Sequence, residues 1–323
     1  MKNANKVSRS FQHMILLCGC LLIYYSVSAR QHKPTESGYI AQKTQGIDSD
    51  YVLIFNSYSE SAPWCRSLVD STVMDLIKLS PQTMTVTQNL NSGLLRDEKA
   101  LAQLRQQVDV SYHDKPRMII YIGSTSWPFL HETIEKKWGK VPSIIFSDID
   151  YTGPIANLLR KTPIAPALRI PYDKIVKEYE GALSVVYMPI YLRQSLALMH
   201  QLTPPMTELC FISDTRWISA QMRADMAAIT KTDFPELKVR YLISADMSTL
   251  DLLDSLQHYG QETGVLFFSW LKQSQVGDSF VNDSHFRIII SKSARQPLFV
   301  LNDNEVNTDS DVLGGYFPTR AAV

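Results

Sequence analysis

Short apolar runs alternate with longer amphipathic segments from residue 51 onward. In the first half of the chain the apolar runs are YVLIF (51–55), MTVTQ (84–88), RMIIYIG (117–123) and SIIFSD (143–148). Between them, apolar residues recur with helical spacing over residues 64–79, 97–108 and 128–139. Strands that alternate with helices are typical of βαβ units around a parallel sheet, whose strands are apolar because both faces are covered. The pattern therefore predicts an α/β fold.

A second series of strands and helices follows a proline-rich stretch at residues 152–173. Its strands are predicted at 183–188, 208–214, 238–244, 264–270 and 297–303, and its helices at 191–202, 217–230, 248–260 and 284–295. Because prolines interrupt regular structure, we place a domain boundary within this stretch. Two successive series predict two similar lobes, formed by residues 50–165 and 166–313.

The first 29 residues have the pattern of an export signal. Three basic residues precede an apolar run at 14–27, and Ser28 and Ala29 offer a cleavage site before Arg30. The run is shorter than the roughly 20 residues of a membrane-spanning helix. A cleaved signal is the first interpretation, an uncleaved inner-membrane anchor the second, and lipidation at Cys20 the third. All three predict a periplasmic or extracytoplasmic protein, with residues 30–49 as a polar tether.

Polar side chains follow nearly every predicted strand. In open parallel α/β sheets, ligands bind beyond the carboxyl ends of the strands. If the two lobes face each other, these strand ends converge on one cleft that suits a small polar solute. The candidate ligand-binding residues are Asn56, Ser57, Tyr58, Ser59, Ser124, Thr125, Ser126, Asp148, Asp214, Thr215, Arg216, Trp270 and Asp303.

Each of these residues also has a structural interpretation. Ser126, Asp214 or Thr215 can simply cap the helix that follows it. Arg216 can either bind an anionic ligand group or pair with an acidic side chain of the protein. Trp270 can stack on a ligand ring or pack beneath a helix. The ligand-binding interpretation therefore depends on the coincidence across several loops.

Charge and motifs exclude several other classes of function. Lys+Arg and Asp+Glu both number 32, so the chain has no basic excess for binding nucleic acid. The histidines lack metal-ligand spacing, and no glycine-rich phosphate loop or G-x-S-x-G elbow is present. We expect no metal, no cofactor and no catalytic residue in this region. A hydrolase-like enzyme is a less favoured alternative, in which Ser57 or Ser124 would meet Asp148 and a histidine in space.

Two of the four cysteines lie beyond the first 29 residues. Cys65 is expected at the start of a helix and Cys210 in a strand of the other lobe. Two cysteines do not make a disulfide framework, so we expect two separate buried thiols.

Three segments resemble the periplasmic substrate-binding-protein-like family of ABC transporters. In VLIFNSYSESAPW (52–64), an apolar strand leads into Ser-Tyr and then Pro-Trp. Residues 181–214 resemble the family's crossover between lobes, and PLFVLNDNEVNTDSDVLGGYF (297–317) resembles its late strand, polar loop and Gly-Gly strand. The resemblance implies a type I periplasmic-binding fold: two Rossmann-like lobes with parallel sheets, joined by a hinge and closing on a ligand.

The family's cleft loops correspond here to residues 56–59, 123–126 and 214–217, together with Asp148, Trp270 and Asp303. Many relatives carry a histidine before Ser-Tyr where this chain has Asn56. The identity of the ligand is therefore not carried over.

The resemblance also implies a return to the first lobe through a closing helix after the Gly-Gly strand. Residues 314–323 would be only the start of that return, and the sequence stops before the helix. We therefore expect a longer membrane receptor. In this interpretation the chain is the extracytoplasmic sensor of a two-component histidine kinase, with the kinase domain downstream and a membrane-anchored homodimer as its assembly. The alternative is a free solute-binding protein that delivers its solute to an ABC permease.

Overall fold

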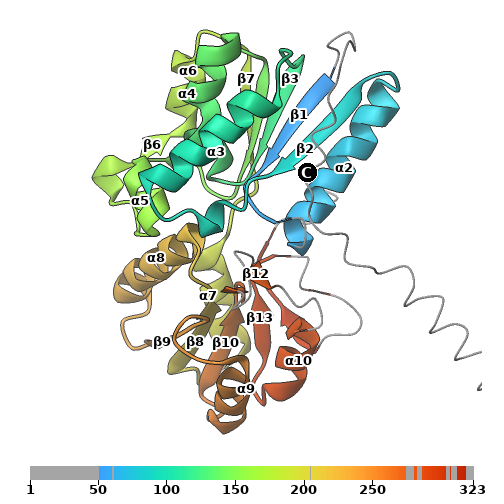
Figure 1. Ribbon diagram of the computed structural model, residues 1–323. Helices are drawn as coiled ribbons and strands as arrows, with labels where there is room; N and C mark the ends of the chain where they lie inside the picture. The colour runs from blue at the N-terminus through green and yellow to red at the C-terminus, as the bar shows by residue number, and fades with distance from the viewer. Residues whose placement is uncertain are drawn as a thin grey trace, which may run out of the picture. The chain divides into compact units, whose positions relative to one another are not determined.

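The computed structural model describes residues 51–59, 62–203, 205–273, 280–281, 286–302, 306 and 311–317. Two five-stranded parallel sheets form its frame (Figure 1). The first sheet contains, in spatial order, β2 (Met84–Asn89), β1 (Tyr51–Asn56), β3 (Met118–Ile122), β4 (Ser143–Ser147) and β7 (Leu183–Tyr187). The second contains β14 (Val312–Gly314), β13 (Leu298–Val300), β10 (Thr263–Phe267), β8 (Glu208–Ser213) and β9 (Lys238–Ile243). The expected α/β class with two parallel sheets is confirmed.

The two sheets have the same strand order. In each, the second strand along the chain lies at one edge, followed by the first, third, fourth and fifth strands. The connections therefore change direction beside the first strand, between β1 and β3 in one sheet and between β8 and β10 in the other. Such a switch point opens a crevice at the carboxyl ends of the strands. The topology alone directs attention to the segments that follow β1, β3, β8 and β10.

Alternate residues of the first sheet pack against different helices. Leu53 and Phe55 belong to a core cluster with Leu101 and Leu104 of α3 (Glu98–Ser111) and with residues of α4 (Ser126–Trp138). Val52 and Ile54 belong to a separate cluster that packs against α2 (Pro63–Leu79). This is the period of two expected when both faces of a sheet are covered.

The second sheet follows the same rule. Cys210 and Ile212 pack with Leu252 of α9 (Thr249–His258) and Ile290 of α10 (Phe286–Ser293). The opposite face of the sheet packs against α7 (Leu192–Leu202) and α8 (Trp217–Asp233) and is part of the same cluster as the α3–α4 face of the first sheet. One apolar core therefore continues from lobe to lobe.

Local signals explain where several helices begin and end. The side chain of Asp97 accepts a hydrogen bond from the N–H of Ala100 and caps α3. Ser248 and Asp251 form a reciprocal capping box at α9. Helix α4 ends at Gly139, whose φ of 70° favours a residue without a Cβ.

The place of residues 183–187 differs from the expectation. They were predicted as the first strand of the second lobe, but β7 pairs with β4 in the first sheet, with Ser143 opposite Leu183. The crossover to the second sheet therefore comes after β7, and the boundary expected at 165/166 lies inside the first lobe. An apolar run shows that a strand is buried, but its partner strand is decided by long-range pairing.

The proline-rich stretch is likewise not a linker. It forms an excursion between β4 and β7, and we call residues 150–171 the arm. The arm contains β5 (Tyr151–Thr152), α5 (Ile155–Arg160), η2 (Pro166–Leu168) and β6 (Ile170–Pro171), and α6 (Tyr172–Glu178) follows it. Strands β5 and β6 pair antiparallel. The prolines lie largely at helix starts and in edge strands, where they are tolerated.

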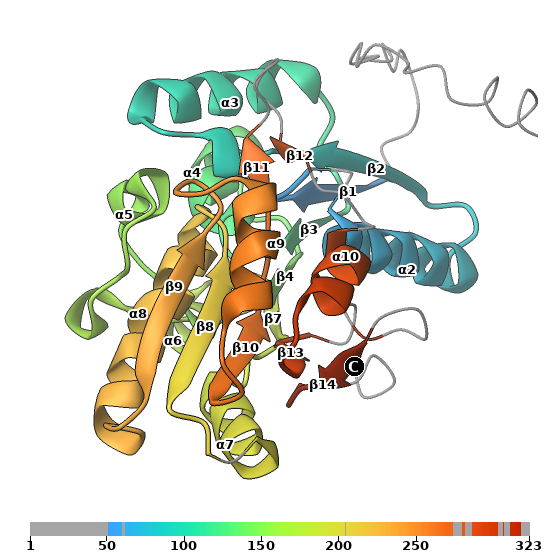
Figure 2. The same cartoon turned by 90° about the horizontal axis from the view of Figure 1, so that it is seen from below.

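The arm bonds to helix α8 of the second lobe, as Figures 1 and 2 also show by the position of α5 beside α8. The backbone N–H of Ile164 donates to Oε1 of Gln221 at 2.8 Å, and the indole N–H of Trp217 donates to the carbonyl of Thr162 at 3.1 Å. Arg169 and Asp225 form an ion pair at 3.0 Å. Gln221 is fully buried. The lobes are therefore joined on this side by buried hydrogen bonds as well as by the chain.

Several expectations fall outside the described residues. These are the export signal or anchor at 1–29, the tether at 30–49 and the end of the chain at 318–323. A short antiparallel pair, β11 (Lys272–Gln273) and β12 (Phe280–Val281), was not predicted. Among the helices of the described part, none has the length and apolar content needed to cross a bilayer.

Replacing Gln221 with Met tests the bond between the arm and α8. The substitution keeps an unbranched side chain but leaves the buried N–H of Ile164 without its acceptor, which costs about 1–3 kcal/mol. We expect urea unfolding to show this loss. The matched change Gln257→Met, on the exposed surface of α9, is expected to alter stability by about 0.5 kcal/mol or less. Equal effects of the two substitutions would contradict a structural role for the Gln221 bonds.

Candidate ligand-binding site

The loops after β1 and β3 are bonded directly to each other. Ser57 donates its N–H to the carbonyl of Ile122 at 2.8 Å, and its Oγ accepts from the N–H of Ser126 at 2.9 Å. Ser126 is the first residue of α4. The Ser57 hydroxyl, from a distant part of the sequence, therefore accepts a hydrogen bond from an N–H at the start of this helix. The Ser126 hydroxyl bonds to the carbonyls of Ile122 and Gly123. Both serines are buried and engaged in holding the loops.

The loop after β2 completes this part of the site, and the sequence analysis missed it. Ser92 begins the short helix η1 (Ser92–Leu94), donates its hydroxyl to the carbonyl of Ser57 at 2.7 Å and lies 2.7 Å from the hydroxyl of Thr125. Asn56 donates its side-chain amide to Asn89 at 2.8 Å. The signal was available, since polar residues also follow the strand predicted at 84–88.

Gly123 allows Tyr58 to lie against the β3 loop. Its φ is +87°, and a Cβ added there would lie 2.6 Å from Cε2 of Tyr58 and 2.8 Å from Oγ of Ser57. A side chain at this position is therefore excluded by both the backbone conformation and the space. The missing Cβ lets the tyrosine ring reach across the carboxyl ends of the strands.

Tyr58 and Asp148 connect the ends of β1 and β4. The Tyr58 hydroxyl donates to Oδ2 of Asp148 at 3.2 Å. Burial raises the pKa of Asp148 from 3.8 to about 6, against the opposing effects of the Tyr58 hydrogen bond and the Arg216 charge. Burial, followed by the Asp148 charge, raises the pKa of Tyr58 well above its ordinary value. Tyr58 is therefore a neutral hydrogen-bond donor, and Asp148 is a carboxylate in an unfavourable environment.

Asp214 and Arg216 form the corresponding cluster in the second lobe, after β8. Oδ1 of Asp214 accepts from the backbone N–H of Arg216 at 2.9 Å and from the hydroxyl of Ser219 at 2.6 Å, and Oδ2 accepts from Nε of Arg216 at 2.8 Å. Asp214 is completely buried. Burial alone would lower the pKa of Arg216, but the Asp214 carboxylate raises it above the ordinary value. The arginine is paired with an acid of the protein, and that acid is buried.

The two clusters meet across the lobes. The guanidinium carbon of Arg216 lies 5.1 Å from the centroid of the Tyr58 ring, within the range of a cation–π contact. From the arm, Lys161 also approaches this region. Its burial and the charge of Arg96 lower its pKa, while Asp214 raises it. The polar strand ends of the two sheets therefore share one electrostatic environment.

The remaining candidate residues differ in how far they are buried. Ser124 is buried, and Ser59 and Thr215 are partly buried. Trp270 is buried in the core of the second lobe with α9, and its indole N–H donates to Thr249 at 3.2 Å. Asp303 lies outside the described residues. Ligand contact by each of the thirteen candidates stays a prediction.

The two cysteines are free and buried, as expected. Cys65 lies in the first turn of α2, and Cys210 lies in β8. Burial, followed by the charge of Asp148, raises the pKa of the Cys65 thiol, so Cys65 is a neutral neighbour of the Tyr58–Asp148 pair. Within the described ranges, no group of three or more His, Cys, Asp or Glu side chains is arranged to hold a metal ion.

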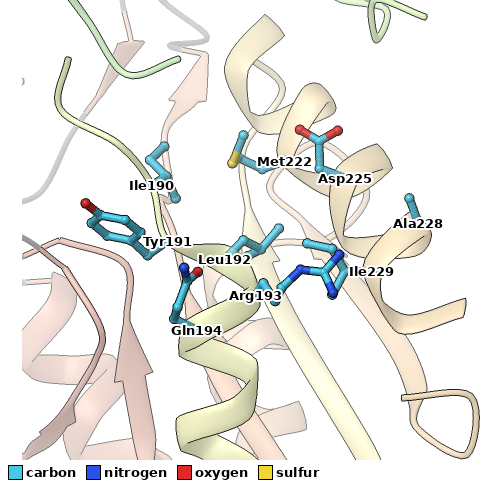
Figure 3. Close-up of a pocket in the computed structure, with 9 residues that line it drawn as sticks. All are labelled: Ile190, Tyr191, Leu192, Arg193, Gln194, Met222, Asp225, Ala228 and Ile229. Carbon is cyan, nitrogen blue, oxygen red and sulfur yellow. The ribbon is translucent and has the colours of Figure 1, made fainter. Parts of the chain in front are cut away.

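A separate hollow of about 320 Å³ lies between the start of α7 and the face of α8 (Figure 3). Its lining is Ile190, Tyr191, Leu192, Arg193, Gln194, Met222, Asp225, Ala228 and Ile229. Its two charged side chains are already paired, Arg193 with Asp233 and Asp225 with Arg169. The hollow therefore offers a mainly apolar surface without a free charge.

No family model and no curated protein matches the sequence. Solved structures do match. An ABC domain from Streptococcus pneumonia in complex with L-Trp is 12% identical, with a TM-score of 0.47 over 80% of this chain and 76% of that one. A carbohydrate-transporter solute-binding protein from Agrobacterium Radiobacter in complex with D-arabinose is 11% identical, with a TM-score of 0.43 over 80% and 79%. A LacI transcriptional regulator from Bacteroides fragilis, described as a candidate one, is 10% identical, with a TM-score of 0.45 over 77% and 76%.

The ligands of those proteins are not assigned to this chain, because the sequence identities and TM-scores are low. The fold follows from the topology itself. Two parallel α/β sheets of the same strand order, with their switch-point loops in contact, define a two-lobe periplasmic-binding-protein-like fold.

Replacing Gly123 with Ala tests the packing of Tyr58. The added Cβ combines an unfavourable φ with a clash against the tyrosine ring, and we expect a loss of about 2–4 kcal/mol in the free energy of unfolding. The control is Gly139→Ala, which has a similar φ of +70° but nothing within 4 Å of the added Cβ. It is expected to cost about 1–3 kcal/mol, because its φ of 70° and ψ of −160° are almost confined to glycine, and to cost less than Gly123→Ala, which adds a clash. If the two variants lose the same stability in urea unfolding, the close approach of Tyr58 is not important.

Replacing Asp148 with Asn tests the buried charge. Because the folded-state pKa of about 6 lies above the ordinary 3.8, ionised Asp148 destabilises the fold fully above pH 6, and this cost disappears as the pH falls toward 4. The variant retains an oxygen that accepts from Tyr58. We expect it to be more stable than the wild type by up to roughly 3 kcal/mol at pH 7.5, with the difference vanishing near pH 4.

Urea unfolding of both proteins between pH 4 and 8 measures this difference. Asp150→Asn, an exposed change in the same loop, is expected to stay within about 0.5 kcal/mol of the wild type. A gap for Asp148→Asn that does not change with pH would show that the carboxylate carries no buried charge.

Proposed function

We propose that this chain is an extracytoplasmic domain that binds a small polar solute between the carboxyl ends of its two sheets. Tyr58 and Asp148 would contact the solute from the first lobe, and Asp214 and Arg216 from the second. Binding without turnover is the proposed activity, and the bound solute is expected to be recovered unchanged.

The contact between Arg216 and Tyr58 is the observation that carries this proposal. It joins the loop after the first strand of one sheet to the loop after the first strand of the other, which are the two switch-point loops. A solute held there touches both lobes at once. Since it makes these contacts only when the lobes are together, its binding shifts the population toward the closed arrangement.

The role of such binding is a second part of the proposal. Delivery to an ABC permease is placed first, since solute-binding proteins of transporters are among the solved structures named above. A sensor that signals lobe closure to a downstream histidine kinase rests on the sequence resemblance only. The two roles share the same site and differ in their partner, so a binding experiment tests what they have in common.

A ligand screen with the full chain tests the binding activity. Thermal shift with amino acids, sugars, nucleosides and small peptides is expected to give at least one hit, which calorimetry then confirms as saturable. Replacing Tyr58 with Ala removes a ring and a hydroxyl donor from the site, and we expect at least a tenfold weaker Kd, or about 1.4 kcal/mol. Tyr316→Ala, at an exposed ring outside this cluster, is expected to bind as the wild type does.

A screen without any hit would argue against solute binding. A hit whose affinity is the same for the wild type and Tyr58→Ala would place the solute elsewhere on the protein.

A further inference from the structure

The two carboxylates of the site, Asp148 and Asp214, differ in how their charges are compensated. Asp214 accepts hydrogen bonds from the backbone and side chain of Arg216 and from Ser219, at 2.6–2.9 Å. For Asp148, the described residues supply one hydrogen bond, from the neutral Tyr58 hydroxyl at 3.2 Å. That bond uses Oδ2 and leaves Oδ1 for another donor.

The basic side chains around the site are directed toward Asp214. Arg216 donates directly to it at 2.8 Å. Lys161, from the arm, interacts with Asp214 and with Arg96. The charge of Arg216 also acts on Asp148, and its guanidinium carbon lies 5.1 Å from the centroid of the Tyr58 ring, whose hydroxyl bonds to Asp148. The Asp214 carboxylate is therefore paired within the second lobe. Among the residues that the structure describes, Asp148 has no cation at ion-pair distance and accepts its hydrogen bond from the neutral Tyr58 hydroxyl.

We propose that the solute carries an ammonium group, and that this group binds Asp148. This inference rests on the proposed function and specifies the chemical class of its ligand. Burying a carboxylate without a cation lowers the stability of the fold. A ligand that brings a positive charge to the carboxylate would offset this loss.

An ammonium group fits the arrangement better than a neutral donor or a metal ion. A solute hydroxyl would satisfy Oδ1 but leave the charge uncompensated, whereas an N–H of an ammonium group forms a charge-assisted bond. A divalent metal ion takes several oxygen ligands, and the described part of the chain holds no cluster of that kind. Asp148 is only partly buried, whereas Asp214 is completely buried.

Matched pairs of solutes test the inference in calorimetric titrations of the full chain at pH 7. Each pair contains an amine and its hydroxyl or amine-free counterpart: L-alanine and L-lactate, L-phenylalanine and L-phenyllactate, D-glucosamine and D-glucose, putrescine and 1,4-butanediol. We expect at least one amine to bind at least tenfold more tightly than its counterpart. In Asp148→Asn this preference is expected to disappear, while Asp150→Asn retains it.

The variants separate a binding effect from misfolding. Asp148→Asn is expected to be at least as stable as the wild type, so a loss of amine binding in a folded, more stable protein identifies the charge as the cause.

Three outcomes contradict these statements in different ways. If compounds bind but no amine binds more tightly than its counterpart, the proposed function holds and the ammonium inference is wrong. The inference is also wrong if Asp148→Asn binds the amine as the wild type does. If no compound of any pair binds either protein, the inference fails for these classes, and the broader screen of amino acids, sugars, nucleosides and peptides decides the proposed function separately.

Discussion

The contact between the Arg216 guanidinium and the Tyr58 ring is the interaction on which the proposed site depends. Each partner is held by its own lobe: Arg216 by the buried Asp214 carboxylate, and Tyr58 by the space that Gly123 leaves and by Asp148. A cation over an aromatic face contributes about 0.5–2 kcal/mol, which is small compared with the stability of either lobe. It can therefore be broken and re-formed without unfolding, as a closing pair of lobes requires.

A second set of contacts limits how the lobes can move. The arm of the first lobe bonds to Trp217, Gln221 and Asp225, which lie on successive turns of α8. Because a single apolar core continues through this region, separating the lobes here would expose buried surface and unpaired backbone groups. At the strand ends, the described contact between the lobes is the one between Arg216 and the Tyr58 ring.

The sequence predicted most elements of both lobes, because strand burial and helix periodicity are local properties of the chain. The sheet that a strand joins depends on distant parts of the chain. The apolar pattern of residues 183–187 fits a strand of either sheet, and β7 pairs with β4 in the first. The arm was interpreted as a boundary because its prolines interrupt regular structure, whereas its position is determined by hydrogen bonds to α8. Polar residues at strand ends could be predicted, since the carboxyl ends of parallel strands converge. The pairing of Tyr58 with Asp148, 90 positions apart, depends on the tertiary fold and could not.

The electrostatics of the site connect stability with function. Asp214 is satisfied within its own lobe and can hold Arg216 in place whether or not a solute is bound. Asp148 is not, so its ionised form stores free energy in the empty protein. A bound solute with a positive charge would offset the free energy that ionised Asp148 costs the fold. The binding free energy would be more favourable by that amount. Sites that trade stability for function in this way are common in proteins. Among the described residues, Asp148 has one hydrogen bond, from a neutral donor, at the carboxyl end of a strand and near the contact between the lobes. This arrangement is the physical basis of the proposed ammonium site.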